Sequence, residues 1–191
     1  MVTLGVDIGQ KHDPTAFCVA QAVTITDCWG FRIRWLERLP LGTPYPDVAD
    51  RIEDLVDQLQ KRPEGLKRVY IDATGVGTPV VDALVGRVSP DLLRAVYLTR
   101  GRVHRITWQG RYWQIRLGKA RLVHRLLGLL QGRCLALPTG AEAQALEAEL
   151  LSYEIRIDTK GHDRYGAFRS GTHDDLVTAL ALAVLGEPEE G

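Results

Sequence analysis

The chain opens with a short hydrophobic run that carries an acid at its far end. Apolar side chains occupy Val2, Leu4, Val6 and Ile8, and Asp7 lies between the last two. A run that is apolar almost throughout predicts a central strand covered on both faces. A carboxylate at the edge of a buried core loses solvation, so it needs a partner that compensates its charge. Asp7 is therefore the first candidate functional residue.

The same arrangement returns further along the chain. The hydrophobic run 69–72 ends in Asp72, and the glycine-rich turn 73–77 leads into a helical pattern that begins near Thr78. A strand, a tight turn and a helix are the elements that this pattern predicts. The first and fourth predicted strands thus each end in an acid.

A third acidic position opens the last hydrophobic helix, which the pattern places at 172–185. Asp174 and Asp175 are adjacent there. Thr172 as the N-cap, with Asp175 three residues later, would explain the pair as a capping box. The pair would instead bind a cation if it met the two earlier acids, because carboxylates about 4 Å apart repel by roughly 4 kcal/mol without one. Neighbours on a helix point about 100° apart, so the pattern leaves open which of the two would bind directly.

The remaining hydrophobic pattern alternates between strands and helices. Strands are predicted at 15–22, 28–39, 69–73, 94–99, 134–137 and 152–157, and helices at 47–60, 119–131 and 141–151. Short spacings between the first three strands favour an antiparallel meander, and the later alternation favours parallel pairing. The stretch 101–117 has no clear period and fits either a mobile loop or a β-ribbon, whereas 161–171 is predicted as a loop.

These elements predict an α/β fold with a mixed central sheet, three antiparallel strands followed by parallel ones, flanked by helices. With 191 residues, of which 45% are hydrophobic and 25% charged, the chain suits a single globular domain over 1–191 with a polar tail at 187–191. It has no run of membrane-spanning length and no signal-peptide layout, which favours the cytoplasm. Three cysteines, an odd count without metal-finger spacing, favour reduced and mostly buried thiols.

The net charge is +0, but the basic residues are gathered in one block. No acid occurs between Asp91 and Glu142, a stretch that holds ten lysines and arginines. Such a block suits contacts with phosphates, and its aromatic side chains suit contacts with sugars or exposed bases. A solvated arginine face is the alternative interpretation. The residues assigned to DNA are Arg100, Arg102, Arg105, Arg111, Arg116, Trp108 and Tyr112.

Five segments, in order, resemble the nuclease domain of the phage terminase large subunit, a member of the RNase H-like nuclease superfamily. They are GVDIGQKHDPTAF, VYIDATGVGTPVVDAL, GKARLVHRLLGLLQGRCLALP, LEAELLSYE and HDDLVTALALA. The resemblance covers nearly the whole chain. It departs from the family in one respect, because the chain contains no GxxxxGK[ST] loop and so no ATPase motor. Whether the chain is a fragment of a longer terminase or free-standing is open.

The resemblance implies a metal-dependent endonuclease that cuts double-stranded DNA with little sequence specificity during phage genome packaging, in the cytoplasm of a bacterial host. It implies Asp7, Asp72, Asp174 and Asp175 as catalytic residues and as ligands of two Mg²⁺ or Mn²⁺ ions. His173 and Lys119 are candidates for supporting roles. A separate ATPase motor, a portal or a small terminase subunit are further candidate partners, and no membrane is expected.

Three other functions fit parts of the pattern. A Holliday-junction resolvase of the same fold would use a similar set of acids on branched DNA. A DNA-binding module without catalysis would use the basic block alone. Asp7, Gly9 and Thr15 also resemble the phosphate loop of actin and sugar-kinase ATPases, although that architecture needs two lobes. Among the other acids, Asp13 is interpreted as a turn residue, and Glu149 and Asp163 are spare candidates.

Overall fold

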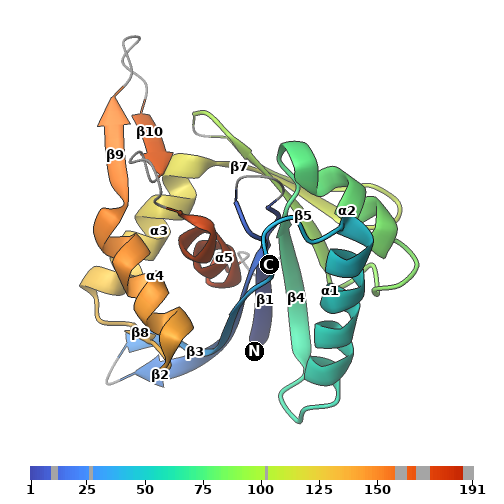
Figure 1. Cartoon of the computed structure of the whole chain (residues 1–191), viewed down its shortest axis with the longest axis horizontal. Coiled ribbons are helices and arrows are strands. Elements are labelled where there is room, and N and C mark those ends of the chain that lie inside the picture. Colours follow the sequence, from blue (N-terminus) through green and yellow to red (C-terminus); the bar gives the residue numbers. More distant parts are fainter. Residues whose placement is uncertain (10–12, 26–27, 102, 158–162, 167–172, 187–191) are drawn as a thin grey trace.

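The computed structural model describes residues 1–9, 13–25, 28–101, 103–157, 163–166 and 173–186. Its main feature is an eight-stranded mixed sheet with the strand order β6-β7-β5-β4-β1-β2-β3-β8 (Figure 1). The strands of this sheet are β1 (Val2–Asp7), β2 (Ala16–Ile25), β3 (Cys28–Arg38), β4 (Leu66–Asp72), β5 (Leu93–Thr99), β6 (His104–Trp108), β7 (Trp113–Gly118) and β8 (Leu135–Ala136). A separate hairpin joins β9 (Glu154–Ile157) to β10 (Asp163–Gly166).

Helices cover both faces of the sheet. They are α1 (Tyr45–Gln60), α2 (Thr78–Leu84), α3 (Lys119–Gln131), α4 (Ala141–Ser152) and α5 (Asp175–Ala183), with a short 3₁₀ turn at Gly75–Gly77 before α2. In Figure 1, α1 and α2 lie on one side of the sheet, and α5 lies between the sheet and the pair α3 and α4 on the other. None of the described helices is long and apolar enough to span a membrane.

The predicted fold class is confirmed. Strands β1, β2 and β3 form an antiparallel meander, and β4 pairs in parallel with both β1 and β5. This is the mixed sheet of an RNase H-like fold. Of the two alternatives for 101–117, the ribbon is correct, because β6 and β7 pair antiparallel and β7 extends the sheet in parallel with β5.

Two details of the prediction were wrong. The predicted loop 161–171 contains strand β10, whose residues 163–166 pair with β9. The expectation of reduced thiols fails at two positions, because Cys28 and Cys134 form a disulfide between the start of β3 and the segment before β8, with their Cα atoms 6.2 Å apart. An odd number of cysteines requires only one unpaired thiol, and here that thiol is the buried Cys18. The predicted polar tail 187–191 lies outside the described residues.

Two hydrophobic cores lie on the two faces of the sheet. Leu4 and Val6 of β1 pack with α1 and α2 on one face. On the other face, α5 is buried from Asp175 to Ala183 among residues of β2, β3, α3 and α4. The central position predicted for the first strand, covered on both faces, follows from these two layers.

Helix α5 lies directly against the backbone of β1. A Cβ atom added at Gly5 would stand 2.2 Å from the carbonyl oxygen of Ala179 and 2.5 Å from the amide nitrogen of Ala183. The hydroxyl of Thr3 donates a hydrogen bond of 2.6 Å to the carbonyl oxygen of Ala183. This close packing fixes α5 relative to the strand that carries Asp7.

Candidate functional site

Strand alternation turns Asp7 toward α5. Successive side chains of a strand point to opposite faces, and Leu4 and Val6 point into the core beneath α1 and α2. Thr3 points the other way, because its hydroxyl bonds to α5. Asp7, four residues further along, therefore shares the α5 face with Thr3.

The same rule places Asp72 beside Asp7. In β4, Ile71 belongs to the core beneath α1, and Tyr70 belongs to the core that contains α5. Asp72 therefore lies on the α5 face with Tyr70. Val6 and Ile71 are partners in the parallel pairing of β1 with β4. Since the register continues, the two acids that follow them lie at neighbouring strand ends.

Helix α5 brings the acidic pair to this end of the sheet. It runs antiparallel to β1, since Ala183 contacts Thr3 and Ala179 contacts Gly5, so its first turn lies at the Asp7 end. The helix begins at Asp175, and Asp174 is the N-cap without a side-chain capping bond. The alternative with Thr172 as the N-cap is therefore wrong, although Thr172 itself lies outside the described residues.

The electrostatics show that these carboxylates lie near one another. Burial raises the pKa of Asp7 well above its ordinary value, and the charges of Asp72, Asp174 and Asp175 raise it further, against a smaller opposing effect of Lys119. Burial also raises the pKa of Asp72, although the Thr74 amide, which donates to its Oδ1 at 2.8 Å, partly offsets this. Poorly solvated acids that repel one another favour protonation or a bound cation.

The acids converge, but they do not form a finished coordination shell. Among the described residues, no group of three or more His, Cys, Asp or Glu side chains is placed to hold a metal ion. Three of the acids have partners of their own. Asp72 accepts from the Thr74 amide, Asp174 lies 3.9 Å from the Lys119 ammonium, and Asp175 accepts from Arg38 at 2.6 Å.

The donor set nevertheless suits a hard divalent cation. All four side chains are carboxylates, which Mg²⁺ and Mn²⁺ prefer. Asp175 is only 1% exposed, and its Oδ1 atom is buried without a hydrogen-bond partner. Side-chain rotations that turn these oxygens toward a common point would let them share a cation.

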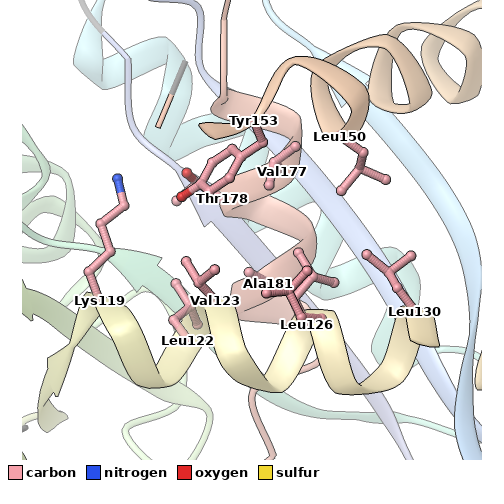
Figure 2. Close-up of a pocket in the computed structure, with 11 residues that line it drawn as sticks. Lys119, Leu122, Val123, Leu126, Leu130, Leu150, Tyr153, Val177, Thr178 and Ala181 are labelled. Carbon is pink, nitrogen blue, oxygen red and sulfur yellow. The ribbon is translucent and has the colours of Figure 1, made fainter. Parts of the chain in front are cut away.

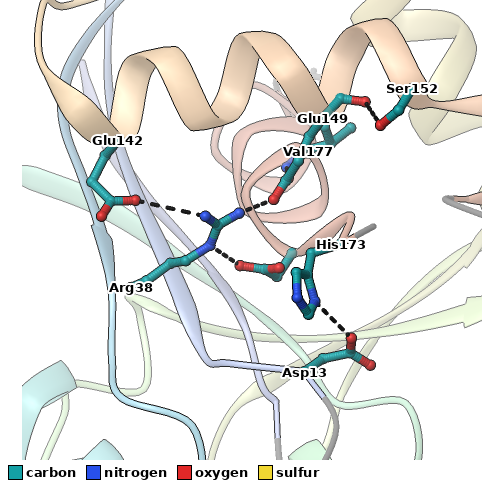
Figure 3. A network of polar contacts seen from close by, with 8 residues as sticks. Asp13, Arg38, Glu142, Glu149, Ser152, His173 and Val177 are labelled. Atoms are coloured by element: carbon teal, nitrogen blue, oxygen red, sulfur yellow. Dashed lines mark hydrogen bonds and ion pairs between the residues drawn. The ribbon is translucent and has the colours of Figure 1, made fainter. Parts of the chain in front are cut away.

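Arg38, at the end of β3, is the residue that the sequence did not single out. Its guanidinium lies between three carboxylates (Figure 3). The Nε atom donates to Asp175 Oδ2 at 2.6 Å, one terminal nitrogen contacts Glu149, and the other lies 4.0 Å from Glu142. Glu149 was a spare ligand candidate, but it is buried and also accepts the Val177 amide at 3.2 Å. Glu149 therefore anchors Arg38 and α5.

His173 and Lys119 lie at the margin of the acidic site. Nδ1 of His173 lies 3.3 Å from Asp13 Oδ1, so the histidine faces Asp13 (Figure 3). Lys119 is the first residue of α3 and lowers the pKa of both Asp7 and Asp72 through its charge. Of the remaining spare acids, Asp163 lies in β10, in the separate hairpin.

Part of the basic block forms the exposed edge of the sheet, at β6 and β7. Arg105 and Arg116 are direct partners across β6 and β7, and both are exposed. Neither forms an ion pair with any residue that the structure describes. Like charges directly opposite each other on a sheet are unfavourable, and a polyanion bound across them would relieve the repulsion. Arg100 is exposed just beyond the end of β5, and Arg102 lies outside the described residues.

The aromatic candidates lie at the other end of β7. Lys119 directly follows β7, whereas Arg111 and Tyr112 lie in the turn before it, so Tyr112 is seven residues, or roughly 23 Å of extended strand, away from Lys119. Trp108 is 44% exposed and contacts the ring of Trp113, with centroids 5.3 Å apart. Tyr112 is partly buried against the core beneath α1 and α2. The structure therefore does not bring Trp108, Arg111 or Tyr112 to the acids.

A cavity of about 110 Å³ lies beside the site, between α3 and α5 (Figure 2). Leu122, Leu126 and Val177 are among the apolar side chains that line it, and Lys119 stands at one end. Because no acid lines this cavity, it is not the place where the four carboxylates meet.

Comparison with solved structures gives one consistent result. The large terminase nuclease from thermophilic phage G20c is similar with a TM-score of 0.68 and 22% sequence identity, over 98% of this chain and 83% of that one. The fold is that of a terminase nuclease. The human cytomegalovirus terminase nuclease domain, soaked with manganese, is similar with a TM-score of 0.57 and 11% identity, over 96% and 81% of the two chains.

The nuclease domain of the bacteriophage SPP1 large terminase, solved with bound manganese, is similar over 95% of this chain. That domain is 12% identical, with a TM-score of 0.57 and 84% of its length covered. No family model and no curated protein matches the chain by sequence. The resemblance read from the sequence is thus confirmed at the level of the fold.

Proposed function

We propose that the chain is a metal-dependent endonuclease that cuts double-stranded DNA, as in phage genome packaging. The observation that carries the proposal is the convergence of Asp7, Asp72, Asp174 and Asp175, from β1, β4 and the start of α5, at one end of a terminase nuclease fold. Related structures support a divalent cation, since the G20c nuclease has been solved with bound magnesium and with bound cobalt.

The four carboxylates would hold two Mg²⁺ or Mn²⁺ ions. Such ions supply charge that activates a water and stabilises the leaving oxygen of the phosphodiester. Asp7 is the natural shared ligand, because it ends the strand at the centre of the site and feels the charge of the other three acids. Asp72 and the pair Asp174 and Asp175 approach it from different elements. Lys119, whose ammonium lies 3.9 Å from Asp174, would contact a backbone phosphate.

The test of catalysis is cleavage of supercoiled and linear plasmid with Mg²⁺, Mn²⁺ or EDTA. We expect cutting with either metal and none with EDTA, and a loss of about 1,000-fold or more in Asp7→Ala, equal to several kcal/mol of barrier. Asp57→Ala, which removes an exposed acid from α1, is the matched control and should cut like the wild type. Metal-dependent cutting that persists in Asp7→Ala would exclude this centre. Faster cutting of four-way junctions than of duplex would instead indicate a junction resolvase.

DNA binding is tested separately at the exposed strand edge. We expect Arg105→Gln with Arg116→Gln to weaken binding to duplex DNA and to lower the salt-dependence slope by about 2, close to one unit per lost phosphate contact. The single change Arg116→Gln should also raise stability by roughly 0.2–1 kcal/mol, because it removes a like-charge cross-strand pair. Arg62→Gln, beyond the C-terminal end of α1, is the control. An unchanged slope in the double variant would place the DNA elsewhere.

A further inference from the structure

We propose that Arg38 is a positioning residue, which turns the Asp175 carboxylate so that one oxygen faces the acidic site and thereby strengthens binding of a divalent cation. The proposal rests on the proposed nuclease function, because it gives Asp175 a place among the ligands. Arg38 itself contacts no reacting atom. It acts through the side chain of Asp175 and the backbone of α5.

The contacts leave Asp175 with one bound and one free oxygen. Arg38 Nε holds Oδ2 at 2.6 Å, whereas Oδ1 is buried and has no hydrogen-bond partner. The Asp175 side chain is 1% exposed, so water does not satisfy that atom. A buried carboxylate oxygen without a partner is rare in folded proteins. The Asp175 carboxylate lies at the start of α5, the helix whose first turn lies at the Asp7 end of β1.

Glu149 fixes the orientation of Arg38. It contacts a terminal guanidinium nitrogen, and its Oε2 accepts the amide of Val177 at 3.2 Å. Val177 follows Asp175 by two residues, so Glu149 holds the first turn of α5 and the guanidinium together. A planar guanidinium can hold two carboxylates in fixed directions at once, which the point charge of a lysine does not.

Simple electrostatics predicts the opposite effect for loss of Arg38. Removing a positive charge beside a cation site should tighten cation binding, and exchanging arginine for lysine should leave it nearly unchanged. Positioning predicts weaker binding in both cases, because partners that orient metal ligands typically contribute about 10- to 100-fold to metal affinity. The direction of the change therefore separates the two explanations.

The experiment titrates the full chain with Mn²⁺ in the absence of DNA. Binding is measured by calorimetry or from the electron paramagnetic resonance signal of free Mn²⁺. We expect Arg38→Lys and Arg38→Gln to bind Mn²⁺ about 10- to 100-fold more weakly than the wild type. Arg51→Gln is the matched control. Arg51 pairs with Glu37, the residue before Arg38 on β3, and has a similarly half-buried side chain. Its variant should bind Mn²⁺ within about twofold of the wild type, as expected for an independent site.

Equal or tighter Mn²⁺ binding in both folded Arg38 variants would overturn the proposal while leaving the metal centre intact. Absence of Mn²⁺ binding by the wild type would instead remove the metal centre, and the role of Arg38 with it. Circular dichroism checks folding of each variant. Should Arg38→Gln fail to fold, Arg38→Lys decides alone, because it keeps the positive charge that the neighbouring carboxylates need.

Discussion

Asp7 is placed where its charge opposes folding unless a cation is present. Its carboxylate is crowded by three other acids at a poorly solvated strand end, and its pKa is raised for that reason. The positive charge of Lys119 lowers this pKa, but its effect is smaller than that of the acids. Residues at functional sites commonly reduce the stability of the protein that carries them.

Because the Asp7 charge opposes folding, we expect Asp7→Asn to raise the free energy of unfolding by an amount that depends on pH. The raised pKa means that the folded metal-free protein retains a proton which the unfolded chain releases above about pH 4, so stability falls as the pH rises through that window. Asparagine carries no such charge. We expect Asp7→Asn to be roughly 0.5–2 kcal/mol more stable than the wild type at pH 7 in EDTA. The difference should shrink toward pH 4, as measured by thermal unfolding.

Two comparisons make this result specific. Asp57→Asn, at an exposed position of α1, should show no such pH-dependent difference. Added Mn²⁺ should raise the unfolding temperature of the wild type and not that of Asp7→Asn, because only the wild type keeps the shared ligand. A constant offset between Asp7→Asn and wild type from pH 4 to pH 8 would contradict the electrostatic origin.

Individual candidate ligands could be predicted from the sequence, but the residues that contact them could not. Asp7 and Asp72 each stand at the end of a hydrophobic strand, which is a local signal. In the sequence, Arg38 looks like any other polar residue of a strand. Its hydrogen bond to Asp175 joins residues 137 positions apart. No periodicity encodes such a contact. The separation of Trp108 and Tyr112 from the acids could not be predicted for a related reason, because it is the hairpin that carries them to the far end of β7.

At the scale of elements, the contact between β1 and α5 determines where the acidic pair lies. The contact needs a position without a side chain, since a Cβ atom at Gly5 would overlap the backbone of Ala179 and Ala183. Any displacement of α5 moves Asp174 and Asp175 relative to Asp7. Gly5 therefore controls both the packing of α5 on β1 and the position of the acidic pair relative to Asp7.

Two glycine substitutions should therefore have opposite effects. Gly5→Ala forces α5 away from the sheet, and we expect a loss of about 1–3 kcal/mol or more in unfolding free energy. Gly128→Ala lies within α3, where an added Cβ meets nothing within 4 Å, so it should gain roughly 0.5–1 kcal/mol. Denaturant unfolding measures both. Equal stability of Gly5→Ala and the wild type would mean that α5 does not pack as described.

Elements with a strong period were the easiest to predict. Helix α3 spans the predicted 119–131, and α1 begins only two residues before its predicted start. The edge hairpin was ambiguous because β6 is mostly exposed and β7 is only partly buried, so little alternation marks them. Strand β10 was missed because its residues, 163–166, have poor strand propensity and acquire their structure by pairing with β9.

At the scale of the molecule, a covalent bond joins distant parts of the sheet. The disulfide between Cys28 and Cys134 closes a loop of 106 positions and ties β3 to the segment after α3. It adds to the parallel pairing of β3 with the short strand β8. Cross-links over long loops chiefly restrict the unfolded chain.

Reduction should therefore lower stability without removing a core contact. We expect dithiothreitol to lower the unfolding free energy by roughly 2–4 kcal/mol and to leave a variant with both Cys28→Ser and Cys134→Ser unchanged. Thiol titration of the denatured protein should find one free thiol, Cys18, before reduction and three after it. Three thiols before reduction would show that the bond does not form in solution.

The contact between Thr3 and Ala183 joins positions 180 residues apart. A ribosome completes β1 and β4 long before it makes α5, so the growing chain carries Asp7 and Asp72 without the acidic pair and with one face of the sheet uncovered. The proposed cutting activity therefore cannot begin before α5 has been synthesised. A nascent chain close to nucleic acid is harmless until its last described helix has been synthesised and has docked, so the order of synthesis itself acts as a safeguard.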